Sequence, residues 1–168
     1  MLRQLSMGPR SRAQLIAKLA EREMPAEVSR RVLDRFEQVG LIDDAAFAAG
    51  WVRSRHATRG LSRRALGHEL RGKGIDDDLA AVALATLDVD DERTAAEHLV
   101  VRRLRSMRSL PRQTQVSRLV AMLARKGYGG GLALQVVRDA LGAIDAADAA
   151  DAADAAYAQA AGEDQPDD

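Results

Sequence analysis

The chain has 168 residues, of which 46% are apolar but only 3% aromatic, a composition that suits closely packed helices better than a β-sandwich. It has no cysteine, no apolar run near the ~20 residues of a membrane span and no apolar signal-peptide segment; this excludes disulfides and thiolate metal sites and predicts a cytoplasmic protein without a membrane partner. The formal net charge is zero, but acidic residues are concentrated at the C-terminal end.

Signals for helices follow one another along the whole chain. The residues expected to open helices are, in chain order, Ser11, Pro25, Asp43, Ser62, Asp76, Asp90 or Asp91, and Pro111. The residues expected to close them are Gly40, Gly60, Gly74 and Gly127. Between these points Leu and Val recur at helical spacing, and no stretch alternates with period two. The sequence therefore predicts an all-α fold.

The helical pattern repeats along the chain. A shift of 51 positions places Ser11 on Ser62 and Met24 on Ile75, and a further shift of 53 places Gly74 on Gly127. Such spacing predicts tandem three-helix repeats, stacked into an elongated, curved array. The expected divisions are an N-terminal extension at 1–9, repeats at 10–59, 60–108 and 109–142, and an acidic Ala/Asp-rich tail at 143–168.

The tail conceals the charge of the rest of the protein. It holds eight acidic residues and no Lys or Arg, so residues 1–142 carry 25 basic against 17 acidic residues, a formal charge of +8. Because the tail consists mostly of Ala and Asp and has few large apolar side chains to dock it, we expect it to be disordered or transiently helical, and either simply solvated or an internal competitor for the basic body. The basic body indicates a polyanionic partner or, alternatively, a surface charged only for solubility.

Little in the sequence predicts catalysis or metal binding. The three histidines lie on different predicted helices without ligand spacing. Asp43–Asp44 and Asp76–Asp78 precede predicted helices, where capping explains them better than a metal does. Gly129–Gly131 could face a phosphate, but no strand precedes them and no Lys-Ser/Thr follows, so a flexible turn is the better interpretation. We predict a non-enzymatic protein without cofactor or metal.

Two clusters of basic residues are the candidate binding sites. The first comprises Arg53, Arg55, Arg59, Arg63, Arg64, Arg71 and Lys73. The second comprises Arg102, Arg103, Arg105, Arg108 and Arg112. Guanidinium groups bind phosphates and carboxylates bidentately, so these clusters suit nucleic acid or an acidic protein, the alternative being a solvated cationic face without a ligand. With so few aromatic residues for base stacking, DNA contact is expected to be led by phosphates and to be sensitive to salt.

Three segments together resemble the RecX family of recombination regulators, in its actinobacterial branch. They are residues 39–48 (VGLIDDAAFA) with Trp51 to Arg55, residues 59–66 (RGLSRRAL) with Glu69-Leu70 and Lys73 to Asp76, and residues 123–128 (LARKGY) with Val136-Val137. The resemblance covers about residues 10–142. Family members usually carry a longer segment before the first repeat, and the Asp-Ala-Ala tail is not a family hallmark.

The resemblance implies a fold and a partner. RecX-like proteins are curved arrays of three-helix repeats that bind RecA filaments on single-stranded DNA and restrain ATP hydrolysis, strand exchange and coprotease activity, which damps the SOS response. The resemblance also implies direct contact with DNA as an option, and it brings no catalytic or metal-binding residues. We expect a monomer whose two basic clusters grip the filament. The alternative hypothesis is a DNA-binding protein that acts without RecA, for which the glycine-punctuated helix pairs are compatible with a helix-turn-helix; a hydrolase or metal enzyme has the least support.

Overall fold

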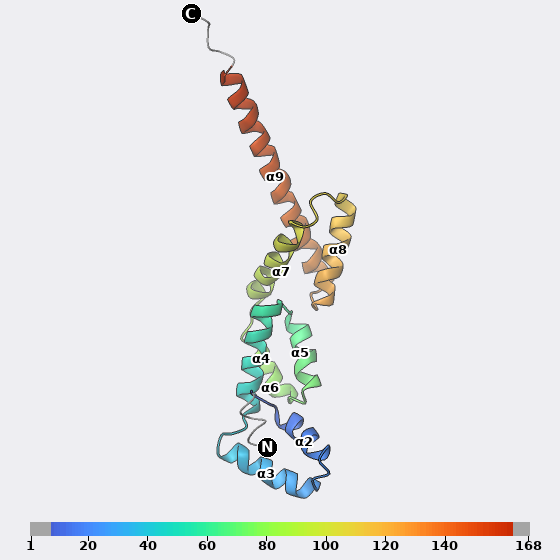
Figure 1. Cartoon of the computed structure of the whole chain (residues 1–168). Helices are drawn as coiled ribbons and strands as arrows, with labels where there is room; N and C mark the ends of the chain where they lie inside the picture. The colour runs from blue at the N-terminus through green and yellow to red at the C-terminus, as the bar shows by residue number, and fades with distance from the viewer. Residues whose placement is uncertain (1–7, 163–168) are drawn as a thin grey trace, which may run out of the picture. The chain divides into compact units, whose positions relative to one another are not determined.

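The protein is helical throughout the part of the chain that the structure describes. This computed structural model describes residues 8–162, and the side chains of residues 8–155 (Figure 1). Its helices are α2 (Arg12–Ala20), α3 (Ala26–Gln38), α4 (Asp44–Arg59), α5 (Arg63–Gly72), α6 (Asp77–Leu84), α7 (Val89–Leu104), α8 (Arg112–Arg125) and α9 (Gly130–Gly162). Between residues 8 and 162 there is no strand, and none of these helices combines the length and apolar character needed to cross a bilayer. The predicted all-α fold is confirmed.

Helices α2, α4, α5 and α6 begin directly after the capping residues predicted for them. The side chains of Ser11, Asp43 and Ser62 each accept a hydrogen bond from the amide three residues further along, and Ser11 completes a capping box with Gln14. Asp76 accepts a hydrogen bond from the amide of Asp78 at 2.9 Å. These bonds satisfy amides that have no partner within the helix. They also give the aspartates a structural role, as expected.

The start of α7 corrects the prediction that Asp90 or Asp91 opens this helix. The helix begins at Val89, and Asp88 precedes it. An Asp88 carboxylate oxygen accepts a hydrogen bond from the Asp91 amide at 2.7 Å, and an Asp91 carboxylate oxygen accepts one from the Asp88 amide at 3.1 Å. The sequence analysis considered only Asp90 and Asp91 as caps, although Asp88 lies two residues before Asp90. The reciprocal pair selects Asp88, because the third residue of the first turn must reach back to the cap.

The chain divides into two compact units, and the division falls inside α7. The first unit runs to Ala95 and includes residues 125–128; the second comprises residues 96–124 and the chain from Gly129 onward. In the first unit, a small cluster of Leu15, Leu33 and Ile42 joins α2 to α3. A larger cluster joins α4, α5 and α6 through Phe47, Ala48, Val52, Leu66, Leu70, Ile75, Ala80, Ala83 and Leu87.

The second unit buries apolar residues of α7, α8 and α9. These are Ala96, Leu99, Val100, Leu104, Met107, Leu119, Leu123, Ala133, Val136, Val137 and Leu141. Burial of each Leu, Val or Met side chain among them stabilises the fold by roughly 1.5–3 kcal/mol relative to exposure. Leu141 is the last of these buried residues along the chain. The described core of this unit therefore ends near Leu141, while α9 continues to Gly162.

The sequence repeat reappears in the helix boundaries. The shift of 51 positions carries the start of α2, at Arg12, to the start of α5, at Arg63, and the start of α3, at Ala26, to the start of α6, at Asp77. The large apolar cluster groups α4 with α5 and α6. The division expected between residues 59 and 60 would separate α4 from α5. It follows from the period of the sequence, and as a domain boundary it remains a prediction.

The structure describes the acidic segment as a helix up to residue 162. Helix α9 continues without a break from Gly130 to Gly162, through the Asp-Ala-Ala repeats. Side chains 145–155 are exposed, as expected for a segment with nothing to dock. Alanine has the highest helix propensity, and the preceding buried turns remove the cost of nucleating a new helix. Residues 163–168 of the predicted tail lie outside the described residues.

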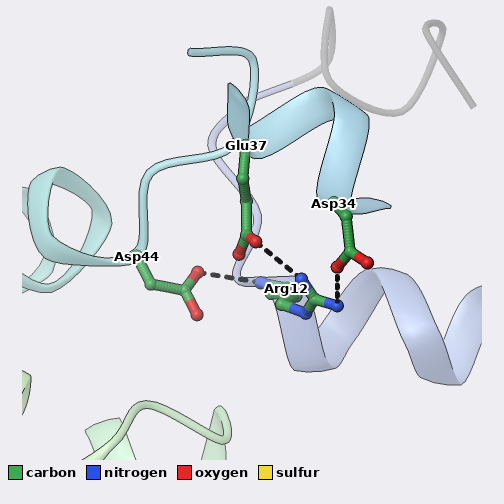
Figure 2. Close-up of polar contacts among 4 residues, drawn as sticks. All are labelled: Arg12, Asp34, Glu37 and Asp44. Carbon is green, nitrogen blue, oxygen red and sulfur yellow. Dashed lines mark hydrogen bonds and ion pairs between the residues drawn. The ribbon is translucent and has the colours of Figure 1, made fainter. Parts of the chain in front are cut away.

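Arg12 ties α2 to α3 and to the start of α4 (Figure 2). Its guanidinium donates to Asp34 and to Glu37, each at 2.6 Å, and its backbone amide donates to Asp44 at 2.8 Å. The hydrogen bond and charge of Glu37 raise the pKa of Arg12, against the opposing effect of burial. Partial burial raises the pKa of Asp44, although the hydrogen bond from the Arg12 backbone opposes that rise.

Replacing Arg12 with Met is expected to lower the free energy of unfolding by about 1 kcal/mol. Methionine keeps most of the apolar stem of Arg12 but leaves the carboxylates of Asp34 and Glu37 without their cation. The expected loss of stability is small because both carboxylates are largely exposed to solvent. Urea denaturation at low and at 1 M salt measures the effect, which should shrink with salt. Arg10→Met is the control, since Arg10 is exposed; an equal loss in both variants would contradict the role given to Arg12.

Candidate partner-binding surface

Trp51 organises the inner part of the first basic cluster. Its indole N–H donates to a carboxylate oxygen of Glu69 at 2.7 Å. The Arg55 guanidinium carbon lies 4.2 Å from the ring centroid, and the Lys73 ammonium lies 3.9 Å from it. The ring also stacks on Phe47, with centroids 5.8 Å apart. One half-buried aromatic ring therefore links α4 to the end of α5 through an acid and two cations.

Arg55 and Lys73 are held by this arrangement. A cation over an indole ring is stabilised by about 0.5–2 kcal/mol, and the Arg55 guanidinium also lies 3.8 Å from Glu69. Both side chains are half-buried. They supply fixed positive charge, but moving either one to meet a partner would break contacts within the protein. The sequence analysis gave Trp51 no part in the basic cluster; the signal that could have found it is Arg55, one helical turn further along.

The outer members of the first cluster are free of ion pairs. Arg53, Arg59 and Arg71 are exposed, and none of them forms an ion pair with the residues that the structure describes. Arg64 is also exposed, but its Nε donates to the carbonyl of Gly127 at 3.1 Å. Arg63 is half-buried, and its backbone amide donates to Glu92 at 2.7 Å. The groups most available to an anionic partner are thus Arg53, Arg59 and Arg71.

Residues 125–128 hold the turn that carries this cluster. The Tyr128 hydroxyl donates to the carbonyl of Gly60 at 3.1 Å, and the Lys126 ammonium donates to the carbonyl of Arg59. The backbone amide of Ser62 donates to the carbonyl of Lys126 at 3.0 Å. These bonds fix the turn between α4 and α5 by a segment more than 60 residues away along the chain. Nothing local in the sequence predicted this contact.

The same junction occurs one repeat earlier in the first unit. The Ser11 hydroxyl donates to the carbonyl of Lys73 at 2.6 Å, and Gly74 lies against Ala13. In the second instance the backbone amide of Ser62, rather than its hydroxyl, donates to the carbonyl of Lys126, and Gly127 lies against Ala65. The serines and the glycines are positions that the sequence shifts of 51 and 53 matched, and each of these glycines follows a lysine. The serines and glycines therefore recur with the repeat because the backbones of successive modules pack closely at these positions.

Tyr128 gives this junction a pH dependence. Burial, with a smaller contribution from the charge of Glu92, raises the pKa of Tyr128 to about 12. Because the unfolded pKa is ~10, the folded state favours the neutral phenol, and its contribution to stability is complete below pH 10 and lost as the pH rises through 12. We expect Tyr128→Phe to reduce stability by about 1 kcal/mol at pH 8 and by less at pH 11.

Absorbance at 295 nm during alkaline titration measures the Tyr128 pKa directly. A Tyr157→Phe background leaves Tyr128 as the single tyrosine, because the chain has two. A midpoint near 10 for the folded protein, or equal destabilisation by Tyr128→Phe at pH 8 and pH 11, would show that the phenol is not enclosed as described.

The second basic cluster lies in the second unit, on the connection between α7 and α8. Arg102 and Arg103 end α7, Arg105 and Arg108 lie in the connection, and Arg112 begins α8. All five are exposed. The buried side chain of Gln115 shapes the connection, because its amide nitrogen donates to the carbonyls of Met107 at 2.9 Å and Leu110 at 3.0 Å.

Arg112 differs from the other members of the second cluster. Its guanidinium forms an exposed ion pair of 2.5 Å with Asp145 on α9. Arg102, Arg105 and Arg108 form no ion pair with the described residues. The seven predicted residues of the first cluster thus belong to one compact unit and the five of the second cluster to the other.

The described residues also include no group of three or more His, Asp or Glu side chains placed to hold a metal ion. Each unit thus presents exposed arginines, and those of the first unit are accompanied by one tryptophan and the module junctions. Such a surface is suited to binding phosphate or carboxylate groups.

Two family models match the chain. Residues 1–36 match the first three-helix domain of RecX, and residues 43–84 match the second three-helix domain of RecX. The second match spans α4, α5 and α6, the same helices that share the large apolar cluster.

Several curated relatives are similar over most of their length. The chain is 54% identical over 140 residues to the "Regulatory protein RecX" of Streptomyces coelicolor, which covers 83% of this chain and 74% of that protein. It is 51% identical over 142 residues to the "Regulatory protein RecX" of Thermobifida fusca, with 84% and 77% covered.

Solved structures agree with these matches. A structure titled "Crystal structure of regulatory protein RecX" has a TM-score of 0.72 at 27% identity, covering 83% of this chain and 68% of that chain. The crystal structure of RecX from Lactobacillus salivarius has a TM-score of 0.73 at 19% identity, which supports the fold alone. By sequence identity over most of the length of these relatives, the chain belongs to the RecX family of regulatory proteins.

Proposed function

We propose that this protein binds RecA filaments on single-stranded DNA and restrains the ATPase, strand-exchange and coprotease activities of RecA. The observation that carries the proposal is the 54% identity to a regulatory protein RecX over 140 residues. The protein acts without catalysis, as a cytoplasmic monomer. Its effect comes from preferential binding to one state of the filament, which shifts the assembly equilibrium or blocks monomer addition.

The exposed arginines support an electrostatic mode of binding. Arg53, Arg59 and Arg71 in the first unit, and Arg102, Arg105 and Arg108 in the second, present guanidinium groups that no acid of the described residues neutralises. A filament groove that contains DNA offers phosphates and carboxylates to such groups. Charges of this kind speed association and select against wrong partners, and their effect falls with salt.

A pull-down and an ATPase assay test the proposal together. The full chain is incubated with RecA assembled on single-stranded DNA in the presence of ATP, and both co-sedimentation and DNA-dependent ATP hydrolysis are measured. We expect co-sedimentation with filaments, and a hydrolysis rate that falls as the protein is added. Hydrolysis unchanged at saturating protein and low ionic strength would refute the proposed function.

Direct DNA binding without RecA is the second candidate. The unpaired arginines favour it, because phosphate contacts need no other feature. A gel shift with single- and double-stranded DNA over a range of salt, with and without RecA, separates the two candidates. Tight binding with a sequence preference in the absence of RecA would favour the second candidate; weak, strongly salt-dependent binding that RecA enhances would favour the first.

A further inference from the structure

The connection between α7 and α8 carries two exposed serines among its arginines. It runs over residues 105–111, and both Ser106 and Ser109 are exposed in it. Met107 lies between them and is buried, and its carbonyl accepts the hydrogen bond from Gln115. The connection thus keeps its apolar residue and part of its backbone on the inside and leaves the two hydroxyl groups accessible from solvent.

Ser106 continues the last turn of α7. Its backbone amide donates to the carbonyl of Arg103 at 3.2 Å, a spacing of three residues that places the side chains of Arg103 and Ser106 on one side of the turn. The Ser106 hydroxyl donates to the Arg103 carbonyl at 2.9 Å, and the Arg103 guanidinium donates to the Ser106 hydroxyl oxygen at 3.4 Å. A guanidinium group therefore already lies at the exposed hydroxyl.

Positive charge surrounds this hydroxyl along the chain as well. Arg102, Arg105 and Arg108 lie four residues before, one residue before and two residues after Ser106. The sequence holds no acidic residue between Glu97 and Asp139. A negative group attached to the Ser106 oxygen would thus be placed among cations.

The other hydroxyl groups of the described part of the chain lack this combination of features. Thr58 has an arginine three residues before it but lies within α4, and Ser62 has one but is buried. Thr86 and Ser109 are exposed outside the helices but have no arginine at that distance. Between residues 8 and 155, Ser106 alone is an exposed hydroxyl residue, outside a helix, with an arginine three residues before it.

We propose that Ser106 is a phosphorylation site for a serine/threonine kinase that recognises an arginine three residues before its target. Kinases select substrates by such charge patterns. The Ser106 oxygen attacks the γ-phosphorus of ATP, and the oxygen–phosphorus bond forms as the bond from that phosphorus to the bridging oxygen of ADP breaks. The hydroxyl proton passes to the catalytic carboxylate of the kinase.

The phosphate is held where it forms and changes the charge of the second cluster. Arg103 pairs with it directly, and Arg102 lies one residue further back on the same turn. A phosphate that carries about two negative charges reduces the +5 charge of the five arginines to about +3. Phosphorylation therefore weakens the attraction of this cluster for an anionic partner; this consequence, unlike the site itself, rests on the proposed function.

Phosphorylation of the full chain tests the site. The chain is incubated with ATP and the catalytic subunit of cyclic-AMP-dependent protein kinase, a kinase with this arginine preference, and the phosphate is mapped by mass spectrometry. We expect phosphate on Ser106, an unchanged rate in the matched control Ser109→Ala, and a rate at least about tenfold lower in Arg103→Gln. Phosphate on Ser109 in place of Ser106, no phosphate on Ser106, or an equal rate in Arg103→Gln would overturn the proposal.

Phosphorus NMR tests whether the arginines hold the phosphate. Phosphoserine is inserted at position 106 during translation, in the parent chain and in the Arg102→Gln, Arg103→Gln double variant. We expect a lower second pKa of the phosphate in the parent, because neighbouring cations favour the dianion. Equal pKa values in the two proteins would contradict the pairing.

Titration of RecA-catalysed ATP hydrolysis tests the consequence for the partner. We expect the parent chain that carries phosphoserine at position 106 to inhibit about tenfold more weakly than the unmodified chain at low ionic strength. Equal inhibition by the two proteins would overturn the regulatory role of the phosphate. An unmodified chain without any effect on hydrolysis would instead contradict the proposed function, and the mapping and the NMR titration would still decide the site.

Discussion

Replacing Gly127 with alanine is expected to lower the free energy of unfolding of the first unit by about 3 kcal/mol or more. Gly127 has a φ of +91°, a region that side chains other than glycine adopt at a cost of ~1–2 kcal/mol. A Cβ at this position would lie 2.6 Å from the Cβ of Ala65 and would also meet the Ser62 hydroxyl. Relieving that overlap requires moving the start of α5 away from residues 125–128, at a further cost of ~1–3 kcal/mol.

Two control substitutions separate backbone strain from the clash. Gly40 has a φ of +70° but open space around its would-be Cβ, so Gly40→Ala should cost only ~1 kcal/mol. Gly50 lies inside α4 with open space, so Gly50→Ala should stabilise the helix by ~0.5–1 kcal/mol. Urea denaturation followed by the fluorescence of Trp51, which lies in the first unit, reports all three. If Gly127→Ala costs no more than Gly40→Ala, then close packing at this junction is not what holds the α4–α5 turn.

The contrast between caps and junctions shows which structural features are local. Ser11, Asp43 and Ser62 were predicted as helix caps because a cap requires only a side chain and an amide three residues away. The bonds of Tyr128 and Lys126 to the Gly60 turn join residues more than 60 positions apart. The sequence indicated them only indirectly, as Lys-Gly pairs that recur with the repeat. The pairs recur because Gly74 packs against Ala13 and Gly127 packs against Ala65, where a larger residue would not fit.

The composition of the candidate binding surface could be predicted from the sequence, but which of its arginines are unpaired could not. The charge of +8 outside the tail, which depends on residue counts alone, indicated an anionic partner, and the positions of the basic residues along the chain indicated two clusters. It could not show that Arg55 and Lys73 lie over the Trp51 ring or that Arg112 pairs with Asp145. These contacts depend on which helix faces meet. They reduce the predicted set to a smaller group of arginines that are free to meet a partner.

Reversing that smaller group in the first unit is expected to have the largest effect on filament binding. We expect the triple variant Arg53→Glu, Arg59→Glu, Arg71→Glu to bind RecA–DNA filaments about a hundredfold more weakly, because three charge reversals at ~1 kcal/mol each total roughly 3 kcal/mol. These side chains are exposed and form no ion pair with the described residues, so the fold should be unaffected. Titration of ATPase inhibition at low ionic strength measures the loss, which should become smaller at high salt.

The matched control must carry the same charge change elsewhere. The triple variant Arg10→Glu, Arg22→Glu, Arg138→Glu replaces three exposed arginines outside both clusters and should weaken binding only a few-fold, through long-range attraction. A third variant, Arg102→Glu, Arg105→Glu, Arg108→Glu, tests the second cluster in the same way. If all three variants weaken binding equally, net charge alone governs association and neither cluster is a specific contact. If the first-cluster and control triples are equal and only the second-cluster variant fails, the gripping surface lies on the α7–α8 connection, where Gln115 fixes the backbone that presents it.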